Sequence, residues 1–183
     1  MFEIIEEPLP GLKIVKPRQF CDDRGEFIKT FHSGLWKKLG LSFALEEEFF
    51  SVSKLNVLRG MHFQLPPHAH NKVVYCVSGS VLDVVVDLRT GSPTFGKSAS
   101  IELSGDNRLI FFIPIGFAHG FLSLSDDSCM IYKTDMVYAP EHDTGIRWDS
   151  FGFNWPGDSF EISDRDQGFA KMNEFDSPFL FTR

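Results

Sequence analysis

Apolar residues in this chain occur in short runs separated by turn residues, and long helical periods are scarce. Val73–Val77 and Val81–Leu88 are two such runs, rich in β-branched residues, with Gly79 between them. This pattern predicts a hairpin whose two strands are largely buried on both faces. Further strands are predicted over Leu12–Val15, Glu26–Phe31, Ser98–Leu103, Arg108–Ile113, Gly116–Leu124 and Cys129–Tyr132.

A helix is predicted at Ser33–Leu39, with Ser33 as the N-cap and Gly40 as the stop. The segment from Trp148 onward is irregular, and its apolar residues predict a tail that packs on the rest of the protein. Many short strands with turns between them indicate a sandwich or a closed barrel. Because no repeat, linker or low-complexity segment is found, residues 1–183 are expected to form a single domain.

Composition narrows the class of protein further. The 183 residues are 43% hydrophobic and 23% charged, which is typical of a globular protein in water. The net charge of −7 provides no basic field for nucleic acid or anionic lipid, although local cations could still bind phosphate. No apolar run approaches the ~20 residues that cross a membrane. The acidic start is unlike a signal peptide, so a cytoplasmic location with reduced Cys21, Cys76 and Cys129 is expected.

The segment Arg59–Gln64 is the first with candidate chemistry. Strand alternation predicts that Gly60 and Gln64 lie beside His62 on one face, with Arg59 on the opposite face. A small residue next to a histidine leaves room for a ligand. A lone histidine at the end of a strand is more often structural, so this segment does not decide the function by itself.

A second histidine occurs in the run Ile113–Phe121, where a Pro-x-Gly turn precedes His119. The simpler interpretation is a buried histidine that bonds to the backbone. Two histidine-bearing strands in one small β-protein nevertheless favour a shared cavity over two unrelated structural histidines.

Taken together, these segments resemble the dTDP-4-dehydrorhamnose 3,5-epimerase family, the RmlC-like cupins. The resemblance covers nearly the whole chain, and Leu-Arg-Gly-x-His-Phe-Gln combined with Gly-Phe-Ala-His-Gly-Phe is a specific pair of motifs. It implies a cupin-type jelly-roll β-barrel with a few short helices. The matching segments are Asp23–Phe27, Ser51–Ser53, Asn56–Gln64, Val84–Arg89, Ser92–Gly96, Ile113–Phe121, Tyr132-Lys133, Gly145–Trp148 and Trp155-Pro156.

The resemblance implies a role for each matching residue. His62 matches the catalytic base, and Asp166 matches the carboxylate paired with it. Lys72 matches a cation near the C4 carbonyl oxygen of the sugar, and Tyr132 matches the acid on the opposite face of the ring. The implied substrate-binding positions are Arg59, Arg24, Phe20, His119, Tyr138, Gln64 and Ser51, together with two that depart from the family, Glu47 and Lys29.

The implied reaction is the movement of a proton next to a ketone in a nucleotide-diphosphate keto sugar. Such a proton is too weakly acidic for a bare imidazole, so a cation at the carbonyl oxygen has to stabilise the enolate. A carboxylate on the other ring nitrogen sets the histidine tautomer and stabilises the imidazolium. This chemistry requires no redox cofactor, and the family is typically a homodimer whose N-terminal strand reaches its partner.

His68 and His70 suggest a metal site, because neutral imidazole is a common metal ligand. Metal-binding cupins follow such a pair with a glutamate seven residues before a glycine. Lys72 occupies that place before Gly79. Since a cation disfavours a divalent ion, no metal is expected.

Three positions depart from the family pattern. Glu47 and Phe49 stand where typical members have glutamine and asparagine, and Lys29 stands where many have a glutamate directed at the base. All three are substrate-reading positions, whereas the catalytic positions are kept. Our hypothesis is that the chemistry is retained and that the nucleotide or the sugar differs.

The leading interpretation is an epimerase acting at C3 and/or C5 of dTDP-4-keto-6-deoxyglucose or a relative, in polysaccharide or natural-product sugar synthesis. One alternative is a single-centre epimerase or ketoisomerase acting on a CDP- or GDP-linked keto sugar. Another is a metal-dependent cupin oxygenase that uses His68, His70 and His119. A third is a cupin that binds the nucleotide sugar without catalysis.

Overall fold

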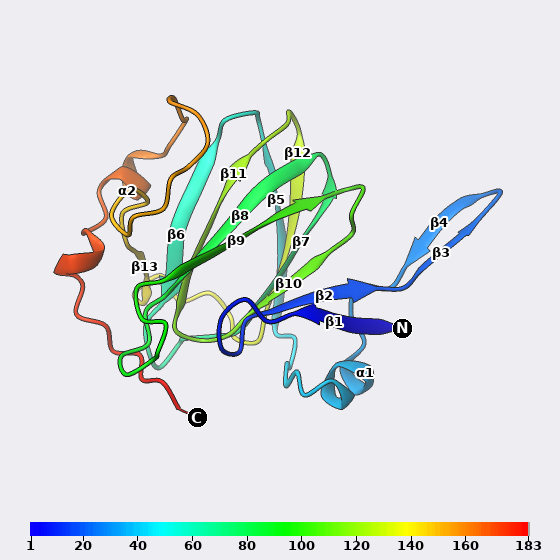
Figure 1. The fold of residues 1–183 in the computed structure, drawn as a ribbon, viewed down its shortest axis with the longest axis horizontal. Helices are drawn as coiled ribbons and strands as arrows, with labels where there is room; N and C mark the ends of the chain where they lie inside the picture. Colours follow the sequence, from blue (N-terminus) through cyan, green and yellow to red (C-terminus); the bar gives the residue numbers. More distant parts are fainter. Residues whose placement is uncertain (183) are drawn as a thin grey trace.

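The computed structural model describes residues 1–182 and consists mainly of two antiparallel β-sheets (Figure 1), which confirms the all-β expectation. The six-stranded sheet has the order β1-β2-β10-β7-β12-β5, and the five-stranded sheet has the order β13-β6-β11-β8-β9. The first contains β1 (Phe2–Glu6), β2 (Lys13–Pro17), β10 (Ile110–Ile113), β7 (Lys72–Ser78), β12 (Ser128–Thr134) and β5 (Glu47–Ser53). The second contains β13 (Asp143–Gly145), β6 (Leu58–Gln64), β11 (Phe117–Ser123), β8 (Ser80–Asp87) and β9 (Ser98–Ser104). The remaining elements are β3 (Gln19–Asp22), β4 (Gly25–Ile28), α1 (Ser33–Lys38), α2 (Asp164–Gln167) and a 3₁₀ turn (Met172–Glu174).

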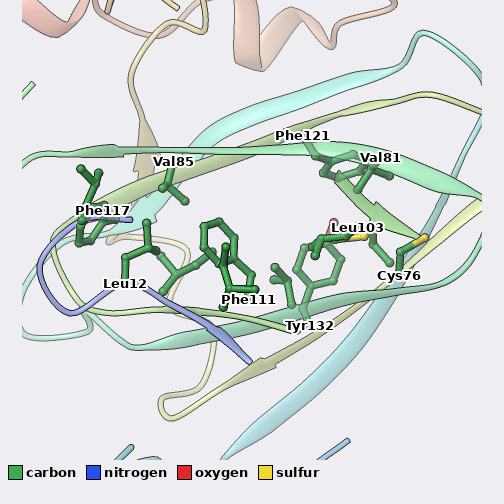
Figure 2. Packing of buried hydrophobic residues seen from close by; sticks show 14 residues of the cluster. Leu12, Cys76, Val81, Val85, Leu103, Phe111, Phe117, Phe121 and Tyr132 are labelled. Carbon is green, nitrogen blue, oxygen red and sulfur yellow. The ribbon is translucent and has the colours of Figure 1, made fainter. Parts of the chain in front are cut away.

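The main hydrophobic core lies between the two sheets (Figure 2). Val81 and Val85 of β8 belong to this core together with Phe111 of β10. The alternate valines, Val84 and Val86, belong to a second cluster that includes aromatic residues of the C-terminal segment. Both faces of β8 are therefore buried, and the tail packs on the five-stranded sheet as predicted. The near-continuous apolar run of β8 reflects burial on two sides.

The hairpin predicted around Gly79 is wrong. β7 pairs with β10 and β12 in one sheet, whereas β8 pairs with β9 and β11 in the other. Gly79 thus lies where the chain passes between sheets, with a φ of 73°. A strand that is apolar on both faces gives no indication of which strand pairs with it. The sequence pattern therefore could not distinguish a hairpin from a connection between two sheets.

The helix predicted at Ser33–Leu39 is present as α1, but its N-cap is His32. The His32 ring nitrogen accepts from the backbone N–H of Leu35, and this makes the predicted Ser33 cap wrong. Trp36 is fully buried and packs α1 against the six-stranded sheet. Within residues 1–182, no helix is long and apolar enough to cross a membrane.

Strands β3 and β4 pair with each other and form an arm, the β3–β4 arm, that extends away from both sheets (Figure 1). Phe20 and Phe27 pack on one another in this arm and remain exposed. Two exposed aromatic rings on a two-stranded ribbon are costly in water.

Replacing Gly60 by alanine is expected to destabilise the fold by about 3 kcal/mol, the sum of overpacking and backbone strain. Gly60 of β6 has a φ of 148°, and a Cβ there would lie 2.6 Å from Gly120 Cα on β11. The two strands would have to separate. Urea unfolding measures the loss.

The matched control is Gly91→Ala, where φ is 83° and nothing lies within 4 Å of the added Cβ. It carries the backbone strain alone, about 1 kcal/mol. Equal losses in the two variants would contradict the proposed contact between the strands.

Candidate active site

A cavity of about 370 Å³ lies between the sheets and is lined by strands of both. It brings together residues that are far apart in the sequence. The predicted residues that line it are Arg59, His62 and Gln64 of β6, Lys72 of β7, Tyr132 of β12, Glu47 and Ser51 of β5, and Tyr138. Phe49 of β5 lines it as well.

His62 and Asp166 form a pair at the cavity wall. His62 Nε2 lies 2.8 Å from Asp166 Oδ1, and the Gly60 N–H donates to Asp166 Oδ2 at 3.0 Å. Burial raises the pKa of Asp166, but the bonds from His62 and Gly60 outweigh it and hold the pKa below its ordinary value. An ionised Asp166 accepts from Nε2–H, and His62 Nδ1 is then the nitrogen that can take a proton.

A bulge in β6 determines which side chains enter the cavity. His119 of β11 pairs with His62 and Phe121 pairs with Arg59, so two residues of β6 stand opposite Gly120 alone. The extra residue shifts the alternation, and Arg59 and His62 line the same cavity. The prediction that Arg59 lies on the face opposite His62 is therefore wrong.

Lys72 supplies a positive charge inside the cavity. Burial lowers its pKa from 10.5 to about 8, and the carboxylates of Asp143 and Asp83 limit the drop. At pH 7 the amine is therefore mostly protonated. A partly desolvated ammonium is a strong electrostatic partner for an oxygen that gains negative charge.

Tyr132 enters the cavity from the sheet opposite to that of His62. Its hydroxyl lies 3.1 Å from Ser51 Oγ, and its ring stacks on Phe49. Burial raises the pKa of Tyr132, which keeps the phenol protonated and able to donate. A base and an acid therefore stand on two opposite walls of one cavity.

His119 lies behind this cavity. Its Nε2 is 2.9 Å from Asp83 Oδ2, and both side chains are buried. It lines a smaller space that it shares with His62 and Lys72. Burial lowers the pKa of His119, although Asp83 opposes the drop.

Three predicted residues support the loops around the cavity. The Gln64 amide is buried, and its Oε1 accepts the N–H of Ala139 at 2.6 Å. Glu47 Oε2 accepts the N–H of Tyr138 at the same distance. Both contacts join the sheets to the segment that carries Tyr138.

Phe20, Arg24 and Lys29 are not brought to the cavity within this chain. They lie on or just after the β3–β4 arm, and none of them lines the cavity. Arg24 is highly exposed and pairs with Asp22.

Arg165 and Asp143 are cavity residues that the sequence did not single out for this purpose. Arg165 Nη2 donates to Asp143 Oδ2 at 2.5 Å. Arg165 also lines the neighbouring surface pocket with Arg59 and Asp166. Arg165 could have been found from its position directly before Asp166, because neighbouring residues of α2 can line the same pocket.

The histidines of the metal-binding alternative are held by separate partners. His68 stacks on His142 at 4.5 Å, His70 lies 3.1 Å from Gln64 Nε2, and His119 bonds to Asp83. In the part of the chain that the structure describes, no group of three or more histidine, cysteine or acidic side chains is arranged to hold a metal ion.

Two facing antiparallel sheets around a cavity are typical of a double-sheet jelly roll. A family model described as dTDP-4-dehydrorhamnose 3,5-epimerase matches residues 6–174. A relative of that name from Methanothermobacter thermautotrophicus is 40% identical over 178 residues, 94% of this chain and 96% of the relative. The chain therefore belongs to the dTDP-4-dehydrorhamnose 3,5-epimerase family, as the resemblance implied.

Solved structures agree with this assignment and confirm the jelly-roll expectation. The RmlC 3,5-epimerase from Legionella pneumophila, in complex with dTDP-4-keto-L-rhamnose, has a TM-score of 0.95 and 34% identity, with full coverage of both chains. ChmJ from Streptomyces bikiniensis, a 3'-monoepimerase in complex with dTDP-quinovose, has a TM-score of 0.86 and 30% identity. The latter match covers 91% of this chain and 86% of ChmJ.

Replacing Lys72 by methionine is expected to stabilise the folded protein at pH 7 and to stabilise it less at pH 9.5. The pKa of Lys72 is about 8 in the folded state, whereas an unfolded lysine titrates near ~10.4. The wild-type protein therefore carries a penalty that is full below pH 8 and fades as the pH rises towards ~10.4. Urea unfolding at both pH values measures it.

Lys37→Met is the control, because Lys37 is exposed at the end of α1. It should change the stability little at either pH. A gain for Lys72→Met that is the same at pH 7 and pH 9.5 would show that burial does not disfavour the charged amine.

Proposed function

We propose that this protein is an isomerase that inverts C3 and C5 of a dTDP-linked 4-keto-6-deoxyhexose. The observation that carries the proposal is the His62–Asp166 pair on one wall of the cavity, with Tyr132 on the opposite wall. Inversion requires a proton to leave one face of a carbon and to return to the other. Family membership supports the choice of substrate class.

In this proposal His62 removes the proton next to the ketone. Asp166 stabilises the imidazolium that results, since its carboxylate is already bonded to the ring. Lys72 donates to the C4 oxygen, where negative charge develops in the enolate. Positioned bases of this kind contribute about 10²–10⁴-fold to the rate.

Tyr132 then donates a proton from its hydroxyl to the opposite face of the carbon. Its raised pKa keeps the hydroxyl in the donating form throughout the physiological range. No redox cofactor or metal takes part in these steps. The residues of the chain supply the base, the acid and the cation.

The nucleotide requires separate groups. Arg59 and Arg165 lie together at the surface pocket beside the cavity, and two guanidinium groups suit a diphosphate. Phe20 and Arg24 belong to the β3–β4 arm, which projects from its own chain (Figure 1), and Lys29 directly follows it. We therefore propose a homodimer in which the β3–β4 arm of one subunit reaches the cavity of the other. We also propose that the protein is cytoplasmic, because its charged substrate does not cross a membrane unaided.

A single-centre epimerase is the second candidate, because the similar ChmJ is described as a 3'-monoepimerase. Both candidates use the same base and differ in the number of carbons inverted. The departures at Glu47, Phe49 and Lys29 lie on or near substrate-reading surfaces and bear on this choice. They also bear on the choice of nucleotide base.

Incubation with dTDP-4-keto-6-deoxyglucose in D₂O is expected to place deuterium at both C3 and C5. His62→Asn should lower the exchange by about 10²–10⁴-fold, because it removes the base. NMR of the sugar measures the exchange. Deuterium at one carbon alone would favour the single-centre candidate, and no exchange in the wild-type protein would contradict the proposal.

Two measurements sharpen this test. His68→Asn is the matched control, since His68 does not line the cavity and should be dispensable. If His68→Asn loses activity and the purified wild-type protein contains stoichiometric iron or nickel, a metal-dependent oxygenase is supported instead. Thermal shifts with dTDP, CDP, GDP and UDP identify the base, because a ligand that binds the folded state raises its stability.

A further inference from the structure

Strand β5 is an edge strand, and two of its residues on one face contact the same tyrosine. Phe49 stands directly opposite Tyr132 in the β5–β12 ladder. The two rings are stacked with centroids 4.8 Å apart and an interplanar angle of 10°. Ser51, two residues further along β5, lies 3.1 Å from the Tyr132 hydroxyl through its Oγ. One strand therefore holds both the ring and the hydroxyl.

The ring of Phe49 covers one face of the Tyr132 ring, and both side chains line the cavity. Tyr132 is only 7% exposed, whereas Phe49 is 45% exposed and lines the cavity. The His119 ring approaches Tyr132 edge-on, with centroids 6.3 Å apart. Two rings thus contact the Tyr132 ring, and Phe49 is the more exposed of the two.

The stack restrains one particular motion of Tyr132. Because the hydroxyl lies on the axis of the ring, a ring flip does not move it. A swing of the whole side chain about χ1 does move it, and Phe49 occupies the space towards β5 into which the ring would swing. The bond to Ser51 alone fixes the oxygen weakly, since a neutral hydrogen bond contributes about 1 kcal/mol.

We propose that Phe49 is a positioning residue: by stacking on Tyr132 it aims the phenol hydroxyl at the substrate carbon and keeps cavity water from replacing it. This inference rests on the proposed function and deepens it. One proton passes from the carbon to His62, and one passes from the Tyr132 hydroxyl to the opposite face of the carbon. Solvent then takes the first proton and restores the second. Phe49 determines how often abstraction ends in inversion rather than in return to the same face.

Phe49→Leu tests the proposal, because leucine keeps an apolar side chain but cannot stack. In D₂O, the number of inversions for each deuterium exchanged is expected to fall about tenfold, a part of the 10²–10⁴-fold that a positioned acid contributes. The change should appear in kcat more than in KM. Tyr132→Phe removes the hydroxyl altogether and therefore gives the largest expected fall in the inversion ratio.

Two further variants separate positioning from general damage. Phe50→Leu makes the same substitution at the next residue of β5, whose side chain is 68% exposed and does not line the cavity. It should leave the ratio of inversion to exchange unchanged. Phe49→Tyr keeps the aromatic ring and should retain the wild-type ratio. A merely structural role for Phe49 would lower exchange and inversion together.

A second readout needs no substrate. The chain has three tyrosines, so ¹³Cζ-tyrosine NMR can follow each phenol, with Tyr132→Phe to assign the signal. In Phe49→Leu the Tyr132 signal should titrate at a lower pH than in the wild-type protein, because water then solvates the phenolate. An unchanged inversion ratio in Phe49→Leu would overturn the proposed aiming of the hydroxyl, and an unchanged titration would overturn the proposed exclusion of water.

The two proposals fail in different ways. If the wild-type protein exchanges no deuterium into any keto sugar, the proposed function fails, and the tyrosine titration alone still decides whether Phe49 shields Tyr132. If the wild-type protein inverts its substrate and Phe49→Leu does so with the same ratio, only the role of Phe49 fails.

Discussion

The carboxylate of Asp166 joins three parts of the molecule at one point. One oxygen accepts from His62, and the other accepts from the N–H of Gly60 in the bulged strand β6. Asp166 itself lies on α2, whose N-cap Ser163 receives the Asp166 N–H. One ionised group therefore orients the base, holds the bulged strand and adds to the docking of the tail.

The cavity assigns different tasks to the two sheets. The five-stranded sheet carries the proposed base and the arginine proposed to bind the diphosphate, whereas the six-stranded sheet carries Lys72 and the proposed acid. A substrate bound between them would have donors and acceptors on both sides. Electrostatic groups that are already in position do not have to reorganise as charge develops. The burial that makes the charged Lys72 unfavourable for folding would also strengthen its proposed effect on an enolate.

The sequence predicted most of the inner strands, because their apolar runs are buried on both faces. The edge strands β1 and β5 were missed, since glutamates such as Glu3 and Glu48 interrupt their apolar pattern. The bulge that turns Arg59 into the cavity depends on the close approach of Gly60 to Gly120, which is a contact between strands. Asp166 was found only through resemblance, because 104 residues separate it from His62 and no local pattern links them. The stacking of Phe49 on Tyr132 likewise requires the register of two strands.

The position of α2 late in the chain has a consequence for biosynthesis. The proposed base lies on a strand that emerges from the ribosome early, and its partner carboxylate emerges only when about nine-tenths of the chain has been made. The two sheets can pair from residues that precede α2, since all named strands end before Ile146. The docking of the tail therefore completes the pair of His62 and Asp166 only after every strand has been made. A nascent or truncated chain that ends before α2 lacks the carboxylate that bonds to His62.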